Sequence, residues 1–263
     1  GCDAIDICVP PTPVQYWAIQ HLGASGGVCI TGSHNPPEYN GYKVYNQFGG
    51  QIVPPEDKQI VAHIDALQFS DIQWEENPAL IHHIDKEADD AYCATVSSKS
   101  LLSEADRKKT SVVFTSLHGT ATATMPAVFE KAGYTNIHWV EEQSEPDGNF
   151  PTVASPNPEE KDAFKLALEK AKKVGADIIL GTDPDADRLG IGVKNMEGKW
   201  TLLNGNQLMV VLTRFVLENS PYSAKNFIAS TIVSTPMMIK MADAFKTECK
   251  LGLTGFKWIA KMI

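Results

Sequence analysis

The chain has 263 residues, of which 43% are hydrophobic and 21% are charged. This balance is typical of a globular protein and excludes a disordered, collagen-like or rod-shaped coiled-coil chain. The formal net charge of -9 argues against a nucleic-acid-binding surface, which needs clustered Lys and Arg, but it allows one local cationic pocket for a small anion.

The apolar runs are short: the stretch Leu208–Leu212 lies far below the roughly 20 residues of a membrane-spanning helix, so no membrane partner is predicted. No charged-then-apolar leader opens the chain. The five cysteines are odd in number and form no C-x-x-C pair, which favours reduced thiols and a cytoplasmic location. Both ends lie inside patterned sequence, so we expect a piece of a longer protein.

Strand-like and helix-like segments alternate along the chain, which indicates α/β layers. The first part is expected to contain a helix N-capped by the Thr12 hydroxyl and ended by Gly26-Gly27, a strand over 28–31, a polar loop over 32–40, a strand over 42–45 and a helix over 56–67.

Two further units follow. The second is expected to contain a strand over 111–115, a helix over 121–132, a strand over 137–140, a helix begun by Asn157-Pro158-Glu159-Glu160 and a strand over 177–180. The third begins near Asn204, whose spacing to Gln207 fits a capping box, and continues with a strand over 227–233 and a helix over 237–245. We therefore predict consecutive α/β domains with mixed sheets flanked by helices, at 1–103, 104–200 and 201–263.

The strongest chemical signal is Gly181-Thr182-Asp183-Pro184-Asp185-Ala186-Asp187-Arg188. On extended backbone the three aspartates share one face. Converging carboxylates repel one another unless a cation lies between them, so the pattern predicts a hard divalent ion rather than a solvated acidic loop. An EF-hand is excluded because its sixth and twelfth positions would hold Arg188 and Lys194. Arg188 is suited to grip a phosphate.

A second segment, Thr31–Lys43, places Ser33 and His34 in a loop rich in Gly, Asn and Pro. Alone it is weak, because serine in such a loop is usually turn chemistry, and it matches neither a G-x-S-x-G elbow nor a G-x-x-x-x-G-K-[ST] phosphate loop. Together with the acidic loop, this segment indicates phosphoryl transfer, because a cation bound by the aspartates would neutralise a phosphate on the serine. We expect Ser33 to carry a phosphoryl group, and Lys43 to serve as acid or base for a sugar hydroxyl if burial or nearby cations lower its pKa.

The motifs T-G-S-H-N-P with N-G-Y-K downstream, G-T-D-P-D-A-D-R and L-T-G-F-K occur in that order. With them the chain resembles the alpha-D-phosphohexomutase family, in particular its bacterial phosphoglucomutase/phosphomannomutase branch. The resemblance implies a truncated version of a four-domain mutase. It implies the following site residues: phosphorylated Ser33, magnesium ligands Asp183, Asp185, Asp187 and the Ser33 phosphate, active-site residues His34, Lys43 and Arg188, and substrate contacts from Asn35, Gly255, Phe256 and Lys257.

The implied reaction interconverts hexose 1-phosphate and hexose 6-phosphate, which makes the enzyme an isomerase. Magnesium is the implied cofactor, glucose 1,6-bisphosphate the implied activator and intermediate, and a small-molecule phosphosugar the partner. Glucose is the first candidate and mannose the second. The oligomeric state does not follow from the sequence.

Three alternatives stay open: a phosphopentomutase, a catalytically silent sugar-phosphate or divalent-cation binding protein of mutase ancestry, and a phosphatase-like hydrolase. The hydrolase motif D-x-D-x-[TV] begins at neither Asp183 nor Asp185. Position 32 is Gly where many family members have Ala, a difference expected to be tolerated. Because the start of domain 1, the rest of domain 3 and domain 4 are missing, we expect this piece alone to be poorly active or inactive.

Overall fold

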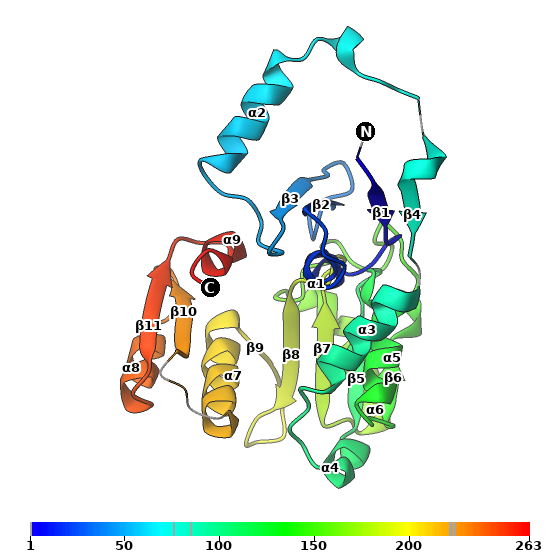
Figure 1. Cartoon of the computed structure of the whole chain (residues 1–263). Coiled ribbons are helices and arrows are strands. Elements are labelled where there is room, and N and C mark those ends of the chain that lie inside the picture. Colours follow the sequence, from blue (N-terminus) through cyan, green and yellow to red (C-terminus); the bar gives the residue numbers. More distant parts are fainter. Residues whose placement is uncertain (1, 76, 85, 221–222, 224) are drawn as a thin grey trace.

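The computed structural model describes residues 2–75, 77–84, 86–220, 223 and 225–263. It holds three consecutive units of strands and helices (Figure 1). The prediction of α/β domains with mixed sheets flanked by helices is confirmed. Within the described ranges, the helices are all too short or too polar to span a bilayer.

The first unit contains two separate pairs of strands. Strand β1 pairs in parallel with β4, and β2 pairs antiparallel with β3. The elements of this unit are β1 (Ala4–Asp6), α1 (Thr12–His21), β2 (Gly26–Ile30), β3 (Tyr42–Asn46), α2 (Glu56–Ala66), short 3-10 helices at Phe69–Asp71 and Pro78–Leu80, β4 (Ile81–His83) and α3 (Lys86–Ser97).

Two predictions for this unit are wrong. Thr12 is not an N-cap: the capping position is Pro11, and Thr12 is the first helical residue, with its hydroxyl bonded to a distant aspartate. The helix ends at His21, and Gly26-Gly27 belongs to β2. A side chain at Gly27 would clash with Gln15 and Ile19 of α1, so this glycine allows the strand to lie against the helix.

The second unit is built on a five-stranded sheet in the order β6-β5-β7-β8-β9. Strand β5 is parallel to β6 and β7, β8 pairs antiparallel with β7, and β9 pairs antiparallel with β8. Its elements are α4 (Glu104–Lys109), β5 (Val112–Thr115), α5 (Ala121–Lys131), β6 (Ile137–Trp139), 3-10 helices at Glu141–Gln143 and Asp162–Phe164, α6 (Lys165–Val174), β7 (Ile178–Thr182), β8 (Leu189–Lys194) and β9 (Trp200–Leu203).

Alternate residues of β5 supply two cores. Val113 packs with α6 on one face of the sheet, and Phe114 packs with α5 on the other. Every residue of β5 is buried, as expected of a central strand covered on both faces. The predicted helix start at Asn157 is wrong, because the Asn157 side chain caps a local turn through the Glu159 amide and the α-helix begins only at Lys165.

The third unit pairs β10 in parallel with β11. Its elements are α7 (Gly205–Asn219), β10 (Phe227–Thr231), α8 (Met237–Ala244), β11 (Glu248–Gly252) and α9 (Phe256–Ala260). The predicted capping box is confirmed, since Asn204 and Gln207 exchange hydrogen bonds at the start of α7. A small core of Ile228, Met238 and Ala242 holds the unit together.

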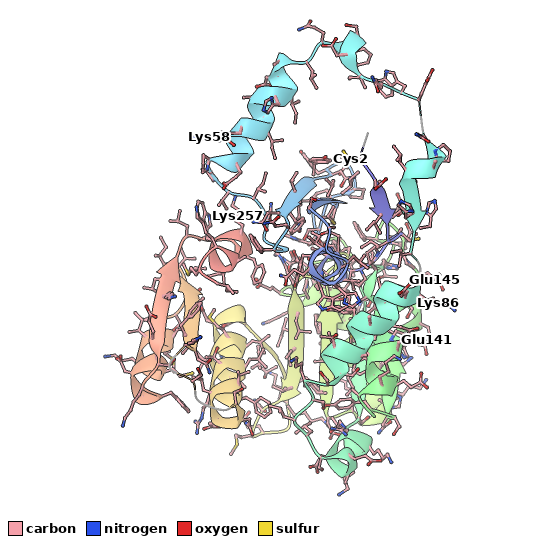
Figure 2. The ribbon with its side chains drawn as sticks, viewed as in Figure 1. Cys2, Lys58, Lys86, Glu141, Glu145 and Lys257 are labelled. Carbon is pink, nitrogen blue, oxygen red and sulfur yellow. The ribbon has the colours of Figure 1, made fainter. Side chains whose placement is uncertain are left out.

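Helix α3 packs against both α1 and α5. The Cys93 thiol reaches the Thr124 carbonyl at 3.8 Å, and the Ser97 hydroxyl donates to the Val128 carbonyl at 3.3 Å. In contrast, α2 and the segment after it extend away from the body of the molecule (Figure 1). No residue of α2 is buried, and its side chains, Lys58 among them, stand around an isolated helix (Figure 2).

Candidate functional site

The acidic loop follows β7 at the carboxyl end of that strand, the edge at which open α/β sheets bind ligands. The Ser33 loop follows β2 in the other unit, and the two loops meet. The Ser33 hydroxyl donates a hydrogen bond to Asp183 Oδ2 at 2.9 Å. The Asp183 side chain is fully buried. The hydrogen bond from Ser33 connects it to the first unit.

Lys43 extends from β3 to the same cluster. Its ammonium lies 3.1 Å from Asp185 Oδ2 and 3.4 Å from Asp187 Oδ2. The Asp185 side chain is 7% exposed and the Asp187 side chain 33%, so the cluster opens to solvent on the Asp187 side. The lysine thus places a positive charge among three carboxylates.

His34 and Arg188 flank the serine. The Nδ1 atom of His34 lies 3.2 Å from Ser33 Oγ, and its Nε2 atom lies 3.5 Å from Arg188 Nη1. The guanidinium also lies 3.9 Å from Asp183 Oδ2 and 4.0 Å from Asp187 Oδ1. It is 43% exposed, which leaves donors available for an anionic ligand.

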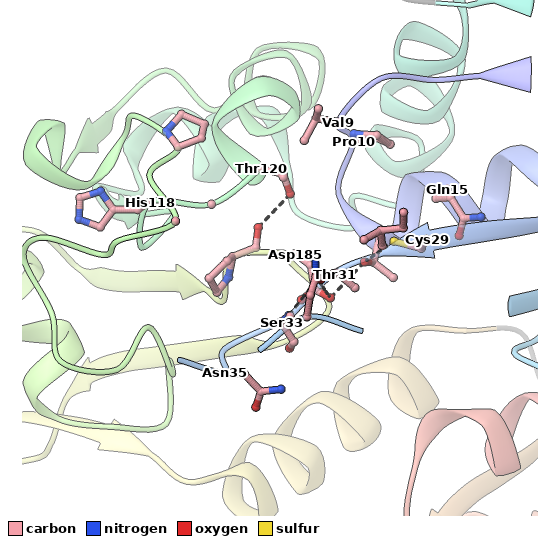
Figure 3. Close-up of a pocket in the computed structure, with 18 of the residues that line it drawn as sticks. Val9, Pro10, Gln15, Cys29, Thr31, Ser33, Asn35, His118, Thr120 and Asp185 are labelled. Atoms are coloured by element: carbon pink, nitrogen blue, oxygen red, sulfur yellow. Dashed lines mark hydrogen bonds between the residues drawn. The ribbon is translucent and has the colours of Figure 1, made fainter. Parts of the chain in front are cut away.

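Local backbone geometry creates this convergence. Ser33 and Ala186 both adopt left-handed conformations, with φ of 51° and 56°, and each turns its loop sharply. The Arg188 amide donates to Asp183 Oδ1 at 3.0 Å, and this bond closes the acidic loop on itself. A turn from the β5–α5 connection supports the loop, since the Thr120 amide and hydroxyl both donate to the Pro184 carbonyl (Figure 3).

The pKa values of the two buried aspartates, Asp183 and Asp185, shift in opposite directions. Burial, together with Asp185 and Asp187, raises the pKa of Asp183 to about 7. Burial acts in the same direction on Asp185, but the Lys43 ammonium and hydrogen bonds from neighbouring groups hold its pKa below the ordinary value. Below about pH 7, and with no divalent cation bound, the cluster therefore favours a protonated Asp183 beside an ionised Asp185.

The pKa of Lys43 does not shift in the direction that acid–base catalysis needs. Burial lowers it, but Asp185 and Asp187 outweigh burial and raise the pKa above its ordinary value. The condition expected from the sequence, a lowered pKa, is not met in the metal-free cluster. For His34, burial and the adjacent Arg188 charge lower the pKa, so the imidazole favours its neutral form.

The donor set fits a hard divalent cation. Asp183, Asp185 and Asp187 each offer a carboxylate oxygen, and these oxygens lie within 4.8 Å of one another. The Oδ1 atom of Asp185 is buried and accepts no hydrogen bond from the described part of the chain. Burying an unpaired carboxylate oxygen is costly, and oxygen ligands of this kind suit magnesium.

A cavity of about 640 Å³ adjoins the cluster. Ser33, Asn35 and Asp185 line one side of it, and His118 lies across from them (Figure 3). The buried His118 ring lies 2.8 Å from the Thr152 hydroxyl, which anchors it within its own unit. The volume is within the range of small-molecule sites.

Gly255, Phe256 and Lys257 stand apart from the cluster, at the start of α9. Phe256 stacks on Tyr16 of α1, with ring centroids 6.2 Å apart, and Lys257 lies over the Trp258 ring. Burial, and then the charge of Asp187, raise the pKa of Tyr16, which indicates that this tyrosine lies near the site. The structure therefore links this loop to the cluster through α1, without direct contact.

Sequence reasoning missed two threonines. The hydroxyls of Thr12 and Thr31 donate to Asp185 Oδ2 at 3.2 Å and 3.1 Å. Thr31 belongs to the T-G-S-H-N-P motif, which was a signal, whereas Thr12 looked like an ordinary helix start. Nothing local in the sequence indicates that its hydroxyl binds a residue of another unit.

Comparison with known proteins agrees with this geometry. Profiles of the phosphoglucomutase/phosphomannomutase family match three parts of the chain: alpha/beta/alpha domain I matches residues 1–71, domain II matches 90–198 and domain III matches 204–263. Together these matches extend over most of the sequence.

Individual relatives point the same way. The chain is 39% identical to a "probable phosphomannomutase" of Haemophilus influenzae over 96% of its own length and 52% of that protein. It is 34% identical to a phosphoglucomutase of Staphylococcus saprophyticus, over 96% and 47% of the two lengths. The chain thus spans about half the length of the curated relatives it matches.

A solved structure has the same fold. The phosphoglucomutase/phosphomannomutase family protein of Burkholderia thailandensis superposes with a TM-score of 0.76 at 24% identity. The similarity covers 99% of this chain and 54% of that one.

Proposed function

The chain belongs to the alpha-D-phosphohexomutase family, and from this membership we propose that it serves in the interconversion of hexose 1-phosphate and hexose 6-phosphate. One observation supports the proposal most: a serine hydroxyl from one unit hydrogen-bonds, at 2.9 Å, to a buried aspartate of an acidic trio in the next. Glucose is the proposed first substrate and mannose the second, because relatives carry both names.

In the proposed reaction, Ser33 carries the phosphoryl group. The bond between Ser33 Oγ and phosphorus breaks, and a bond forms between phosphorus and the free hydroxyl oxygen of the hexose monophosphate. Lys43, in its neutral form, takes the hydroxyl proton, and the departing Ser33 oxygen takes a proton from solvent to become a hydroxyl. The resulting bisphosphorylated hexose turns over, and its other phosphoryl group is transferred to Ser33 Oγ. In that step the Ser33 hydroxyl returns its proton to solvent, and Lys43 gives its proton to the departing sugar oxygen.

Asp183, Asp185 and Asp187 would hold a magnesium ion together with the Ser33 phosphate. When bound, that ion supplies positive charge that compensates the phosphate and offsets the effect of the carboxylates on the Lys43 pKa. Arg188 would bind phosphate oxygens, and neutral His34 would orient the Ser33 oxygen at hydrogen-bond distance.

Asn35 and the loop of Gly255, Phe256 and Lys257 are proposed to contact the sugar. Asn35 lines the cavity beside Ser33, and the loop is connected to the site through the contact of Phe256 with Tyr16. We further propose the domain boundaries 1–103, 104–200 and 201–263, and a cytoplasmic location that suits an odd number of cysteines without a C-x-x-C pair.

The first experiment measures phosphate on Ser33. The longer protein to which we expect this chain to belong is purified, incubated with glucose 1,6-bisphosphate and Mg²⁺, digested, and analysed by peptide mass spectrometry. We expect phosphate on the peptide that holds Ser33 and none in the Ser33→Ala variant. Phosphate on another residue of the wild-type chain, or none at all, would contradict the proposal and favour the silent binding protein.

A second assay separates a mutase from a hydrolase. Glucose 1-phosphate and a trace of glucose 1,6-bisphosphate are supplied to the longer protein to which we expect this chain to belong. Glucose 6-phosphate is the expected main product. Release of inorganic phosphate as the main product would identify a hydrolase.

A further inference from the structure

The two oxygens of Asp185 have unequal surroundings. Oδ2 accepts three hydrogen bonds, from the hydroxyls of Thr12 and Thr31 at 3.2 Å and 3.1 Å and from the Lys43 ammonium at 3.1 Å. Oδ1 is buried and has no hydrogen-bond partner among the described residues. The two hydroxyls and the ammonium therefore all bind the same oxygen of this carboxylate.

Thr12 makes two hydrogen bonds to Asp185. Its backbone N–H donates to the Asp185 carbonyl at 2.8 Å, and its hydroxyl donates to the carboxylate of the same residue. Both residues are buried, with 2% of Thr12 and 5% of Asp185 exposed. The first turn of α1 thus fixes both the backbone and the side chain of a residue in the neighbouring unit.

Thr31 connects Asp185 to the serine turn. Its hydroxyl donates to Asp185 Oδ2 and accepts the Ser33 backbone N–H at 2.9 Å (Figure 3). One hydroxyl therefore sets the position of the acidic side chain and of the residue that carries the proposed nucleophile. A β-branched side chain suits this task because it has few rotamers to lose.

The threonines differ from Lys43 in one respect. The ammonium is a cation and competes with a divalent ion for Asp185 and Asp187, whereas hydroxyls carry no charge and can stay bound when an ion arrives. Two neutral donors on Oδ2 keep the carboxylate from rotating. They leave Oδ1 as the oxygen that lacks a partner.

We propose that Thr12 and Thr31 are positioning residues that hold Asp185 so that its Oδ1 atom is presented to a divalent cation. The inference rests on the proposed function for the existence of the cation site. Its test does not depend on turnover. Neither threonine touches the ion in this proposal, and both act through Asp185.

The experiment measures Mn²⁺ binding to the purified 263-residue chain by electron paramagnetic resonance, with Thr12→Val and Thr31→Val as test variants. Groups that orient a metal ligand typically change affinity by about 10- to 100-fold, and we expect a loss in that range for each variant. Thr12→Ser keeps the hydroxyl and should bind close to wild type.

The matched control is Thr124→Val. Thr124 is also a buried threonine, but it lies on α5 and its hydroxyl has no partner among the described residues, so its removal should leave Mn²⁺ affinity unchanged. Thermal melts accompany each variant. If Thr12→Val unfolds, Thr31→Val and Thr12→Ser decide the question, since Thr31 is only half-buried.

The outcomes separate two failures. Wild-type binding of Mn²⁺ with equal affinity in both valine variants would overturn the positioning role and leave the metal site intact. Absence of Mn²⁺ binding by the wild-type chain would overturn the cation site itself, and the positioning role with it. A lower melting temperature with unchanged affinity would reduce the threonines to packing residues.

Discussion

Asp183 is a carboxyl group that the fold buries completely and supplies with two donors, the Ser33 hydroxyl and the Arg188 amide. Burial and the neighbouring aspartates raise its pKa to about 7. An acid with a raised pKa binds a proton more tightly in the folded chain than in the unfolded one. The metal-free chain therefore loses stability as the pH rises from about 4 to about 7.

Asp183→Asn should remove this pH dependence, because the amide has no proton to lose and still offers an acceptor and a donor. Without metal, we expect the variant to exceed wild type by roughly 2–4 kcal/mol in unfolding free energy at about pH 8, and by little at about pH 4. Saturating Mg²⁺ should reverse the order. Chemical denaturation with and without chelator measures this, and a variant that is less stable at both pH values would contradict it.

Lys43 occupies the space between Asp185 and Asp187 with its own positive charge. Lys43→Met removes a cation that competes with a divalent ion. We expect Mn²⁺ to bind about 3- to 10-fold more tightly to this variant, a gain of about 1 kcal/mol, while phosphoryl exchange on Ser33 is lost. Isothermal titration checks the affinity. Weaker binding in the variant would show that the ammonium supports the site.

At the scale of elements, the β5–α5 turn supports the acidic loop by close contact. A side chain at Gly119 would lie 2.4 Å from Pro184 Cα, and the Thr120 amide is bound to the Pro184 carbonyl. Because the contact is with backbone, the loop itself would have to move.

Gly119→Ala should therefore cost about 1–3 kcal/mol of stability and weaken divalent-ion binding together. Gly148→Ala is the matched control, because nothing lies within 4 Å of its added methyl group. Thermal melts and Mn²⁺ titration of the two variants test this. Equal behaviour of both would mean that the close approach is not part of the support.

The loop backbone approaches Gly32 so closely that a side chain at this position has no room. A Cβ atom there would lie 2.6 Å from the Tyr39 carbonyl oxygen, so alanine would displace the loop backbone in this chain. Patterns of residue type do not reveal such approaches, because the contacting atom is backbone. Glycine, which we expected to be tolerated at this position, leaves room for the Tyr39 carbonyl.

Elements governed by neighbouring residues were predictable. Asn204 and Gln207 form their capping box three residues apart. The three aspartates lie together as predicted, but a turn with Ala186 in the left-handed conformation brings them together instead of the expected extended backbone. Thr12 was not predictable, because its hydroxyl bonds to a partner 173 residues away. A threonine does stand at the start of this helix, but its hydroxyl binds Asp185 instead of capping the helix.

At the scale of the whole molecule, the site belongs to two units at once. Ser33 and Lys43 come from the first unit, and their partners Asp183, Asp185 and Asp187 come from the second. The sequence could indicate both halves but not the distance between them. That distance depends on contacts between residues more than 140 positions apart, such as the bond of Lys43 to Asp185, which no motif encodes.

An ion held by the trio should therefore order both loops together. We expect Mg²⁺ to slow hydrogen exchange of the amides in residues 31–43 as well as 183–188. Mass spectrometry of exchanged peptides measures this, and α7 serves as an internal reference. Protection of the acidic loop alone would show that the two units are not coupled through the site.

The grip of Thr12 on Asp185 also brings the amino end of α1 against the acidic loop. The aligned peptide dipoles of a helix place roughly half a positive charge at that end. The carboxylates thus face a permanent positive pole that needs neither an ion nor a protonated side chain. Because Thr12 and Asp185 are buried, dissolved salt screens this pole only weakly, and the loop keeps part of its compensation in any buffer.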